Sequence, residues 1–181
     1  MKSLLYENLR DLMQKQLFEK ITIKQICDQT GVIRATFYNY FEDKYDCLNC
    51  IVYHDIAEGM FDAMGKTTVS EALEEMLKNV EEHRKFYRIA YNVTGQNSFE
   101  DMIRHNLTLV FEEYLNRHRK PGKLEQYSND LLSRYFAECV AFDIREFVFR
   151  TDDSITVKDT RQMIMDLMKT GLSDLLQTVR E

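Results

Sequence analysis

Residues 34–40 carry guanidinium, hydroxyl, amide and phenol groups at the spacing of one short helix. Arg34 can donate to both major-groove acceptors of guanine, and Asn39 can pair with adenine in a similar bidentate way. Thr36 can meet a thymine methyl group or a phosphate, and Tyr38 suits a phosphate contact that fixes register. These residue types predict a helix that reads base edges in the DNA major groove.

Two short helices and a glycine turn must position these groups. Thr22 is predicted to cap the first helix with Gln25 completing a capping box, and Gly31 to end it. The second helix then covers residues 34–41. The pair can pack against a preceding helix over residues 3–18 through Ile26, Val32, Phe37 and Phe41. This is the layout of a helix-turn-helix, whose second helix enters the groove.

The pattern resembles the DNA-binding domain of the TetR family of bacterial transcriptional regulators, from the first helix to Leu48. The residues that carry the resemblance are Thr22, Ile26, Gly31, Val32, Ala35, Thr36, Phe37, Tyr38, Tyr40, Phe41 and Lys44. The resemblance implies DNA contacts at the positions of Thr22, Lys24, Arg34, Ala35, Thr36, Tyr38, Asn39, Tyr40 and Lys44.

Two features depart from the family pattern. Ile33 stands where the family usually has Ser or a similar cap, and a missing cap costs roughly 1 kcal/mol. The basic arm sometimes found before the first helix is absent, so minor-groove contacts are not expected. The alternative reading, that the aromatic residues only fill a core, is weaker because cap, glycine turn and polar residues agree.

The composition is that of an all-α protein. The 181 residues are 44% hydrophobic and 30% charged, with one proline. We expect about nine helices, in an N-terminal three-helix helix-turn-helix domain (1–48) and a helical ligand-binding and dimerisation domain (49–181). No segment approaches the roughly 20 apolar residues that a membrane span needs. Charged residues interrupt the apolar positions at the N-terminus, so we do not expect a secretory signal there. We therefore expect a cytoplasmic protein that does not bind membranes.

The charge distribution limits how DNA can be held. The net charge is −6, yet residues 1–47 contain seven basic and seven acidic side chains. DNA affinity must then come from placed contacts, because there is no general basic field to supply it.

Helical periodicity and capping residues predict the remaining helices. The expected ranges are 45–64 capped by Asp43 or Asp46, 70–92 capped by Ser70 and bent near His83, 99–119, 124–150, and 157–179 capped by Thr156 with Asp159.

The last two predicted helices have more apolar surface than a single narrow core face needs. Burial within one subunit is the alternative, but operators of two half-sites favour a homodimer. The interface residues that we predict are Phe136, Cys139, Val140, Phe147, Ile164, Met168, Gly171, Leu172 and Leu175.

Aromatic and Met residues are concentrated between residues 53 and 111. Such side chains line adaptable apolar pockets, although they also fill ordinary helical cores. The ligand pocket that we predict contains Tyr53, Phe61, Phe86, Tyr87, Tyr91 and Met102.

Cys47, Cys50 and His54 share one face of a predicted helix and could bind a metal or sense oxidants. One CxxC without a second pair is weak evidence, so we predict no metal and no cofactor. No P-loop, dinucleotide fingerprint, nucleophile elbow or HExxH motif occurs in the sequence, so we predict no enzyme.

The sequence thus predicts a DNA-binding transcriptional regulator, most simply a repressor that a small apolar ligand releases from a double-stranded operator. The alternatives are control by a partner protein and control by cysteine-based redox or metal sensing.

Overall fold

The computed structural model describes residues 1–122 and 124–170, which form helices and connections without a strand. The all-α class predicted from the sequence is confirmed. The helices are α1 (Lys2–Met13), the 3₁₀ turn η1 (Phe18–Lys20), α2 (Ile23–Thr30), α3 (Arg34–Tyr38), α4 (Lys44–Val52), the π-helical turn η2 (Tyr53–Glu58), α5 (Gly59–Ala63), α6 (Val69–Glu82), α7 (Arg84–Ala90), α8 (Phe99–His118), α9 (Asn129–Phe149) and α10 (Val157–Lys169).

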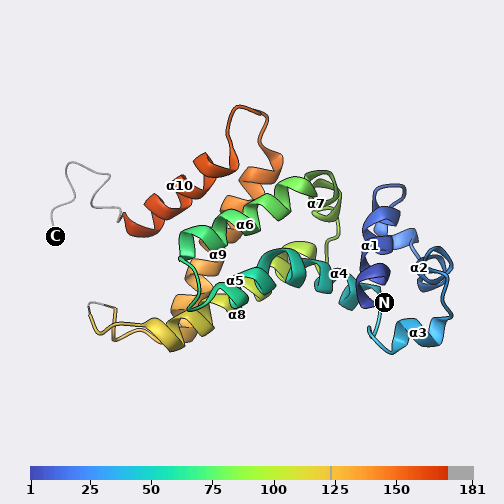
Figure 1. The fold of residues 1–181 in the computed structure, drawn as a ribbon, viewed down its shortest axis with the longest axis horizontal. Coiled ribbons are helices and arrows are strands. Elements are labelled where there is room, and N and C mark those ends of the chain that lie inside the picture. The colour runs from blue at the N-terminus through green and yellow to red at the C-terminus, as the bar shows by residue number, and fades with distance from the viewer. Residues whose placement is uncertain (123, 171–181) are drawn as a thin grey trace.

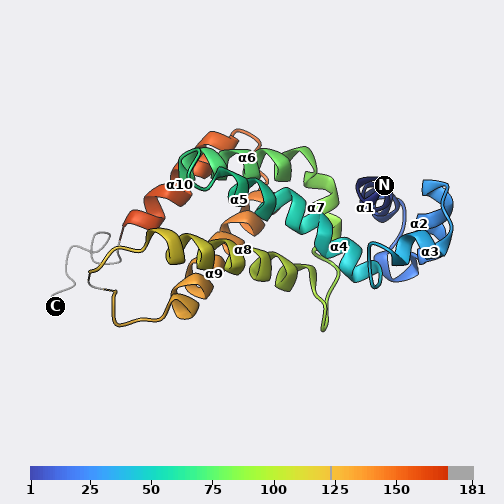
Figure 2. The same ribbon diagram turned by 60° about the horizontal axis from the view of Figure 1, so that its bottom comes forward.

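The first three helices form a small unit at one end of the molecule, and α4 leads from it into a larger helical bundle (Figure 1). In the bundle, α8 and α9 pack along each other, while α10 rests mainly on α6 (Figures 1 and 2). The predicted boundary at residue 48 falls inside α4, and the division into two domains remains a prediction.

Several predicted helix starts are confirmed because the expected caps are made. Thr22 and Gln25 form a complete capping box at α2, and Thr156 and Asp159 form another at α10. The Asp43 carboxylate accepts hydrogen bonds from two backbone N–H groups at the start of α4. The predicted bend near His83 is also confirmed, since α6 ends at Glu82 and α7 begins at Arg84.

Other boundaries were wrong for local reasons. Ser70 does not cap α6; Thr68 does, because Glu71 stands at the position that completes a capping box. The helix that was expected to begin at residue 124 begins instead at Asn129. The preceding residues form a turn in which the Arg119 guanidinium donates to the carbonyls of Leu124 and Tyr127. The first helix ends at Met13 rather than at 18, and residues 171–179 of the last predicted helix lie outside the described residues.

The core runs continuously from the three-helix unit into the bundle. Phe86, Tyr87 and Phe99 are fully buried and meet edge to face, which aromatic rings prefer. None of the helices that the structure describes is long and apolar enough to span a bilayer.

Candidate nucleic-acid interface

The turn between α2 and α3 is built as the sequence predicts. The Thr22 Oγ1 atom accepts from the Gln25 N–H at 3.2 Å, and Gln25 Oε1 accepts from the Thr22 N–H at 2.8 Å. Gly31 ends α2 with φ of 75°, a left-handed conformation that costs other residues about 1 kcal/mol or more. The Val32 N–H then donates to the Cys27 carbonyl at 3.0 Å, which sets the direction of α3.

One face of α3 is anchored in the core of the small unit. Phe37 has no exposed surface and its ring centre lies 5.4 Å from that of Phe41. Ile26 of α2 is equally buried, so α2, α3 and α1 share one apolar core. The position of α3 is therefore fixed by packing and not by the few hydrogen bonds of a five-residue helix.

The opposite face of α3 brings together most of the residues expected to read DNA. Arg34, Ala35 and Asn39 are exposed, Tyr38 is 55% exposed and Tyr40 42% exposed. Thr36 is half-buried at the edge of this face. In the described part of the chain, the Arg34 guanidinium has no ion-pair partner, so all of its donors are available to a base or phosphate. Their contact with DNA remains a prediction.

The start of α3 lacks a side-chain cap. Ile33 occupies the N-cap position, makes no capping hydrogen bond and is 71% exposed. Its backbone is already in the extended conformation that an N-cap residue adopts, with φ of −84° and ψ of 157°.

Replacing Ile33 with Ser should supply the missing cap. We expect the Ile33→Ser variant to raise the free energy of unfolding by about 1 kcal/mol, because the hydroxyl would accept from a free backbone N–H of α3. Chemical denaturation of both proteins measures the change. An Ile33→Ala variant is the control, since it removes the apolar side chain without adding an acceptor, and an equal gain in that variant would contradict the capping explanation.

The start of α2 could offer a phosphate its backbone N–H groups and the Lys24 side chain. The Thr22 hydroxyl is engaged in the capping box, and Lys24 is paired with Asp28 at 2.5 Å across an exposed turn. Such an exposed pair is worth little, so Lys24 can exchange it for a phosphate. A phosphate here would also meet the N–H groups at the positive end of the helix.

Lys44, whose position implies a phosphate contact, is engaged within the protein. Its ammonium group donates to the carbonyls of Phe18, Glu19 and Ile21 at 2.8, 3.2 and 3.1 Å. It also lies 4.5 Å from the centre of the Phe18 ring, and burial lowers the pKa of the amine. Lys44 therefore ties α4 to the loop before α2, and its three donors are already used.

A buried polar contact joins the three-helix unit to the bundle. Arg10 of α1 is 2% exposed and donates to the Asp55 carboxylate of η2 at 3.0 Å. The same carboxylate accepts from the Tyr87 hydroxyl at 3.2 Å, and the Asp55 carbonyl accepts from Asn79. Asp55 lies in a π-helical turn, a geometry that is frequent at functional sites.

The contact between Arg10 and Asp55 was not predicted from the sequence. The available signal was Arg10 on the apolar stripe of α1, between Leu9 and Met13, where a charge needs a buried partner. Nothing in the sequence points to Asp55 as that partner, because 45 residues separate the two and the π-helical turn shifts which residues face α1.

The predicted pocket residues do not surround one cavity. Tyr53 and Phe61 stack at 6.3 Å on the bundle surface, whereas Phe86 and Tyr87 are fully buried in the core. Met102 borders a separate polar hollow near the start of α8. The large open cavities lie elsewhere, between α9 and α10, with volumes of about 660 and 540 Å³.

The predicted interface residues differ in how far they are buried. Val140, Phe147 and Ile164, which we expected at an interface, are buried in the core of the subunit. Phe136, Cys139 and Met168 are half-buried, and Gly171, Leu172 and Leu175 lie outside the described residues. A different stripe of α9 is exposed, at helical spacing: Leu131, Tyr135, Phe142 and Phe149.

Cys27, Cys47 and Cys50 are poorly suited to sensing. Cys47 and Cys27 are buried, and burial raises the pKa of the Cys47 thiol far above its usual range, which suppresses the reactive thiolate. Burial also raises the pKa of the half-buried Cys50 thiol. The described residues contain no group of three His, Cys, Asp or Glu side chains that could hold a metal ion.

Sequence comparisons group the chain with regulators of transcription. Residues 67–170, more than half of the chain, match a TetR family described as Transcriptional regulator C-terminal region. The chain is 26% identical over 147 residues to the HTH-type dhaKLM operon transcriptional activator DhaS of Lactococcus lactis subsp. lactis (strain IL1403), covering 78% of this chain and 75% of that protein.

Solved structures have the same fold. The dihydroxyacetone kinase operon activator DhaS superposes with a TM-score of 0.69 at 20% identity, over 93% of both chains. A protein assigned to the TetR family from Syntrophomonas wolfei str. Goettingen superposes with a TM-score of 0.62 at 17% identity, over 99% of this chain and 97% of the other.

Proposed function

Since the chain belongs to the TetR family of transcriptional regulators, we propose that it binds a two-fold operator in double-stranded DNA as a homodimer. The observation that carries the proposal is the exposed polar face of α3. The opposite, apolar face of the same helix packs in the core and fixes the position of the polar face. Arg34, Asn39 and Tyr38 are the residues that we propose for the main contacts, and Thr36, Ala35 and Tyr40 flank them. The charge balance of residues 1–47 supports placed contacts as the source of affinity.

The exposed stripe of α9 supports the homodimer. Phe142 and Tyr135 are each 62% exposed, and Leu131 and Phe149 continue the same side of the helix. Exposed aromatic side chains in a row are typical of interface anchors. Two-fold pairing of this face would hold two copies of α3 at a fixed spacing, which an operator of two half-sites requires.

The Phe142→Glu variant should be monomeric. We expect the dimer dissociation constant to rise roughly 30-fold or more, because the substitution removes an aromatic anchor and places a charge in an apolar interface. Sedimentation equilibrium measures the constant. Leu109→Glu is the matched control, since Leu109 is an exposed apolar residue of α8 away from the stripe, and equal dissociation of both variants would contradict the proposed face.

We further propose that a ligand of the bundle controls operator affinity. A ligand that prefers one spacing of the two α3 helices shifts the population toward it, by its differential affinity for the two states. Two connections link the bundle to the three-helix unit. One is α4, and the other is the hydrogen-bonded contact of Arg10 in α1 with Asp55, which also binds Tyr87.

The sign of regulation has two candidates. Release of a repressor by a small ligand is the simpler one, whereas the relative DhaS is named as an operon activator, which favours activation. A reporter driven by the operator, measured with and without the gene for this chain, decides between them. We propose no catalytic role and no cofactor, and a cytoplasmic location follows from the need to reach operator DNA.

A further inference from the structure

Two guanidinium groups of α7 bind the end of α9. Arg84 donates through Nε to the Val148 carbonyl at 3.0 Å, and Arg88 donates through Nε to the same oxygen at 2.9 Å. Both side chains also donate through Nη2 to the Arg150 carbonyl. These pairs join residues that lie 60 to 66 positions apart in the chain. We call Arg84 and Arg88, with the two carbonyls that they bind, the arginine clamp.

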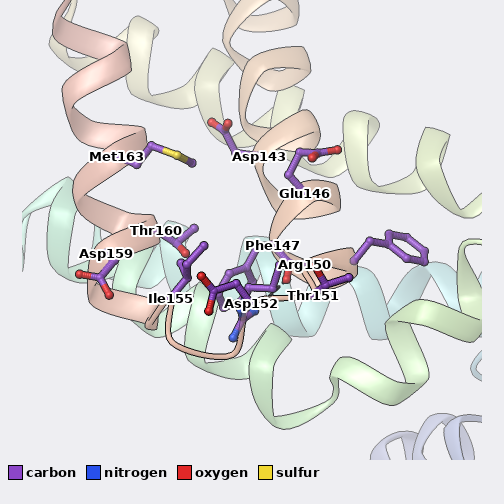
Figure 3. Close-up of a pocket in the computed structure, with 11 residues that line it drawn as sticks. Asp143, Glu146, Phe147, Arg150, Thr151, Asp152, Ile155, Asp159, Thr160 and Met163 are labelled. Atoms are coloured by element: carbon purple, nitrogen blue, oxygen red, sulfur yellow. Dashed lines mark hydrogen bonds between the residues drawn. The ribbon is translucent and has the colours of Figure 1, made fainter.

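The C-terminus of α9 needs donors from outside the helix. The last carbonyls of a helix have no partner within it, and cations stabilise their partial negative charge. The last turn of α9 contains no basic residue of its own. Arg150, which follows the helix, donates to the Phe147 carbonyl at 2.7 Å. Figure 3 shows this end of α9 and the loop through Asp152 that leads to α10. The arginine clamp completes the cap.

The arginine clamp also lies at the end of the exposed stripe of α9. Phe149, the last residue of that stripe, stands between the two residues whose carbonyls are bound. Its ring centre lies 5.4 Å from that of Tyr91, at the end of α7. Helix α7 therefore contacts both the backbone and a side chain of the surface that we assign to the dimer.

Another side of α7 faces the three-helix unit. The Tyr87 hydroxyl donates to the Asp55 carboxylate that binds Arg10 of α1, and the Phe86 ring centre lies 5.3 Å from the Arg10 guanidinium. Residues 84 and 88 are one turn apart, whereas residues 86 and 87 point to a different side of the helix. Helix α7 thus packs against both α1 and α9 and lies between them (Figures 1 and 2).

A second route connects α9 to the three-helix unit through α8 and α4. Helix α8 packs along α9 and against α4, which packs against α1, mainly through apolar side chains. Apolar packing is non-directional, and packed helices can slide past each other by small shear motions. Hydrogen bonds from a guanidinium are directional, because its planar fork presents donors in a fixed geometry. The arginine clamp therefore fixes the position of α7 along α9 more closely than apolar packing does.

We propose that Arg84 and Arg88 are positioning residues for operator binding, which set the spacing of the two α3 helices in the dimer. The inference rests on the proposed function, in which the stripe of α9 pairs two subunits. The connection runs from α9 through the arginine clamp to α7, and from Tyr87 through Asp55 to Arg10 of α1. Since α1 and α3 share one core, this connection holds α3 at one distance from the two-fold axis.

Operators of altered spacing test the proposal. The selected operator is compared with a duplex that has one extra base pair between the half-sites, which adds about 3.4 Å and about 34° of rotation. We expect the wild-type chain to bind the longer duplex roughly tenfold or more weakly, and the double variant Arg84→Met with Arg88→Met to bind it less than threefold more weakly. The variant should also bind the selected operator more weakly, because a freer spacing must be ordered on binding. Titration of both labelled duplexes at fixed salt measures the ratio.

The ratio between the two duplexes separates positioning from stability. A variant that is only less stable has a smaller competent fraction, which weakens both duplexes by one factor and leaves the ratio unchanged. An unchanged ratio in the double variant, with or without such a loss, would overturn the proposal. A dimer dissociation constant raised more than threefold would also overturn it, because the arginines would then act on the subunit interface itself.

Two further variants complete the test. Arg117→Met is the matched control, because it removes an exposed guanidinium that pairs with Glu113 on α8, and it should keep the wild-type ratio. Arg88→Met alone applies if the double variant does not fold, since Arg88 is exposed, and it should lower the ratio at least twofold. A wild-type chain without a two-fold operator would contradict the proposed function and this inference with it. A wild-type ratio that persists in the arginine variants would overturn this inference alone.

Discussion

The Arg34→Ala variant should lose specific operator binding by roughly 30-fold to 20,000-fold. A bidentate contact to guanine is worth about 1–3 kcal/mol of discrimination, and a two-fold dimer makes the contact twice. Arg34 is exposed at the start of α3 and is unpaired in the described part of the chain, so its loss leaves the fold intact. Titration of a labelled operator duplex at fixed salt measures the loss.

The matched control is Arg117→Ala, which removes the same charge from the exposed end of α8, at the opposite end of the molecule from α3 (Figure 1). It should change operator affinity less than threefold, since distant exposed charges are screened. Lys24→Ala should weaken all duplexes alike and reduce the salt dependence, as expected for a phosphate contact. If Arg34→Ala weakened specific and nonspecific duplexes equally, Arg34 would be a phosphate contact and not a base contact.

Breaking the Arg10–Asp55 contact between the three-helix unit and the bundle should destabilise the whole chain. We expect Arg10→Met to lower the free energy of unfolding by about 3–5 kcal/mol, because the Asp55 carboxylate, 3% exposed, would lose its charged partner. Two guanidinium nitrogens of Arg10, Nε and Nη1, are buried without a hydrogen-bond partner, so the native contact is not an optimal ion pair. Urea denaturation of each variant measures the loss.

Three controls separate the buried charge from ordinary packing. The double variant Arg10→Met with Asp55→Leu should lose less than the sum of the single variants, since it leaves no unpaired charge. Tyr87→Phe should cost about 1 kcal/mol through one hydroxyl. Arg134→Met breaks an exposed pair with Asp130 and should cost less than about 1 kcal/mol. Additive losses in the double variant would mean that the pair carries no coupling between α1 and the bundle.

Local chemistry made the small unit predictable from the sequence. The Thr22–Gln25 capping box, Gly31 with its positive φ, and the buried faces of Ile26 and Phe37 each depend on residues within a few positions. The same holds for Thr156 and Asp159 at α10. Local contacts of this kind fix helix ends and turns, so a single sequence is enough to place them.

Long-range geometry could not be predicted in the same way. Lys44 was expected to face DNA, yet it reaches carbonyls 23 to 26 residues earlier in the chain. In α9 both faces contain aromatic residues, so composition alone cannot tell the buried Phe147 from the exposed Phe142. The partner of Arg10 depends on a π-helical turn that has no sequence signature here. In each case the answer depends on which helices meet, and not on local propensity.

The central claim is that α3 reads a two-fold operator, and selection of bound duplexes tests it most directly. The purified full chain is mixed at low salt with a pool of random duplexes, and the retained sequences are determined. We predict an enriched two-fold sequence with half-sites one helical turn or more apart, bound with an affinity that falls steeply as salt rises. No enrichment at low salt, or enrichment that survives unchanged in the Arg34→Ala variant, would contradict the account.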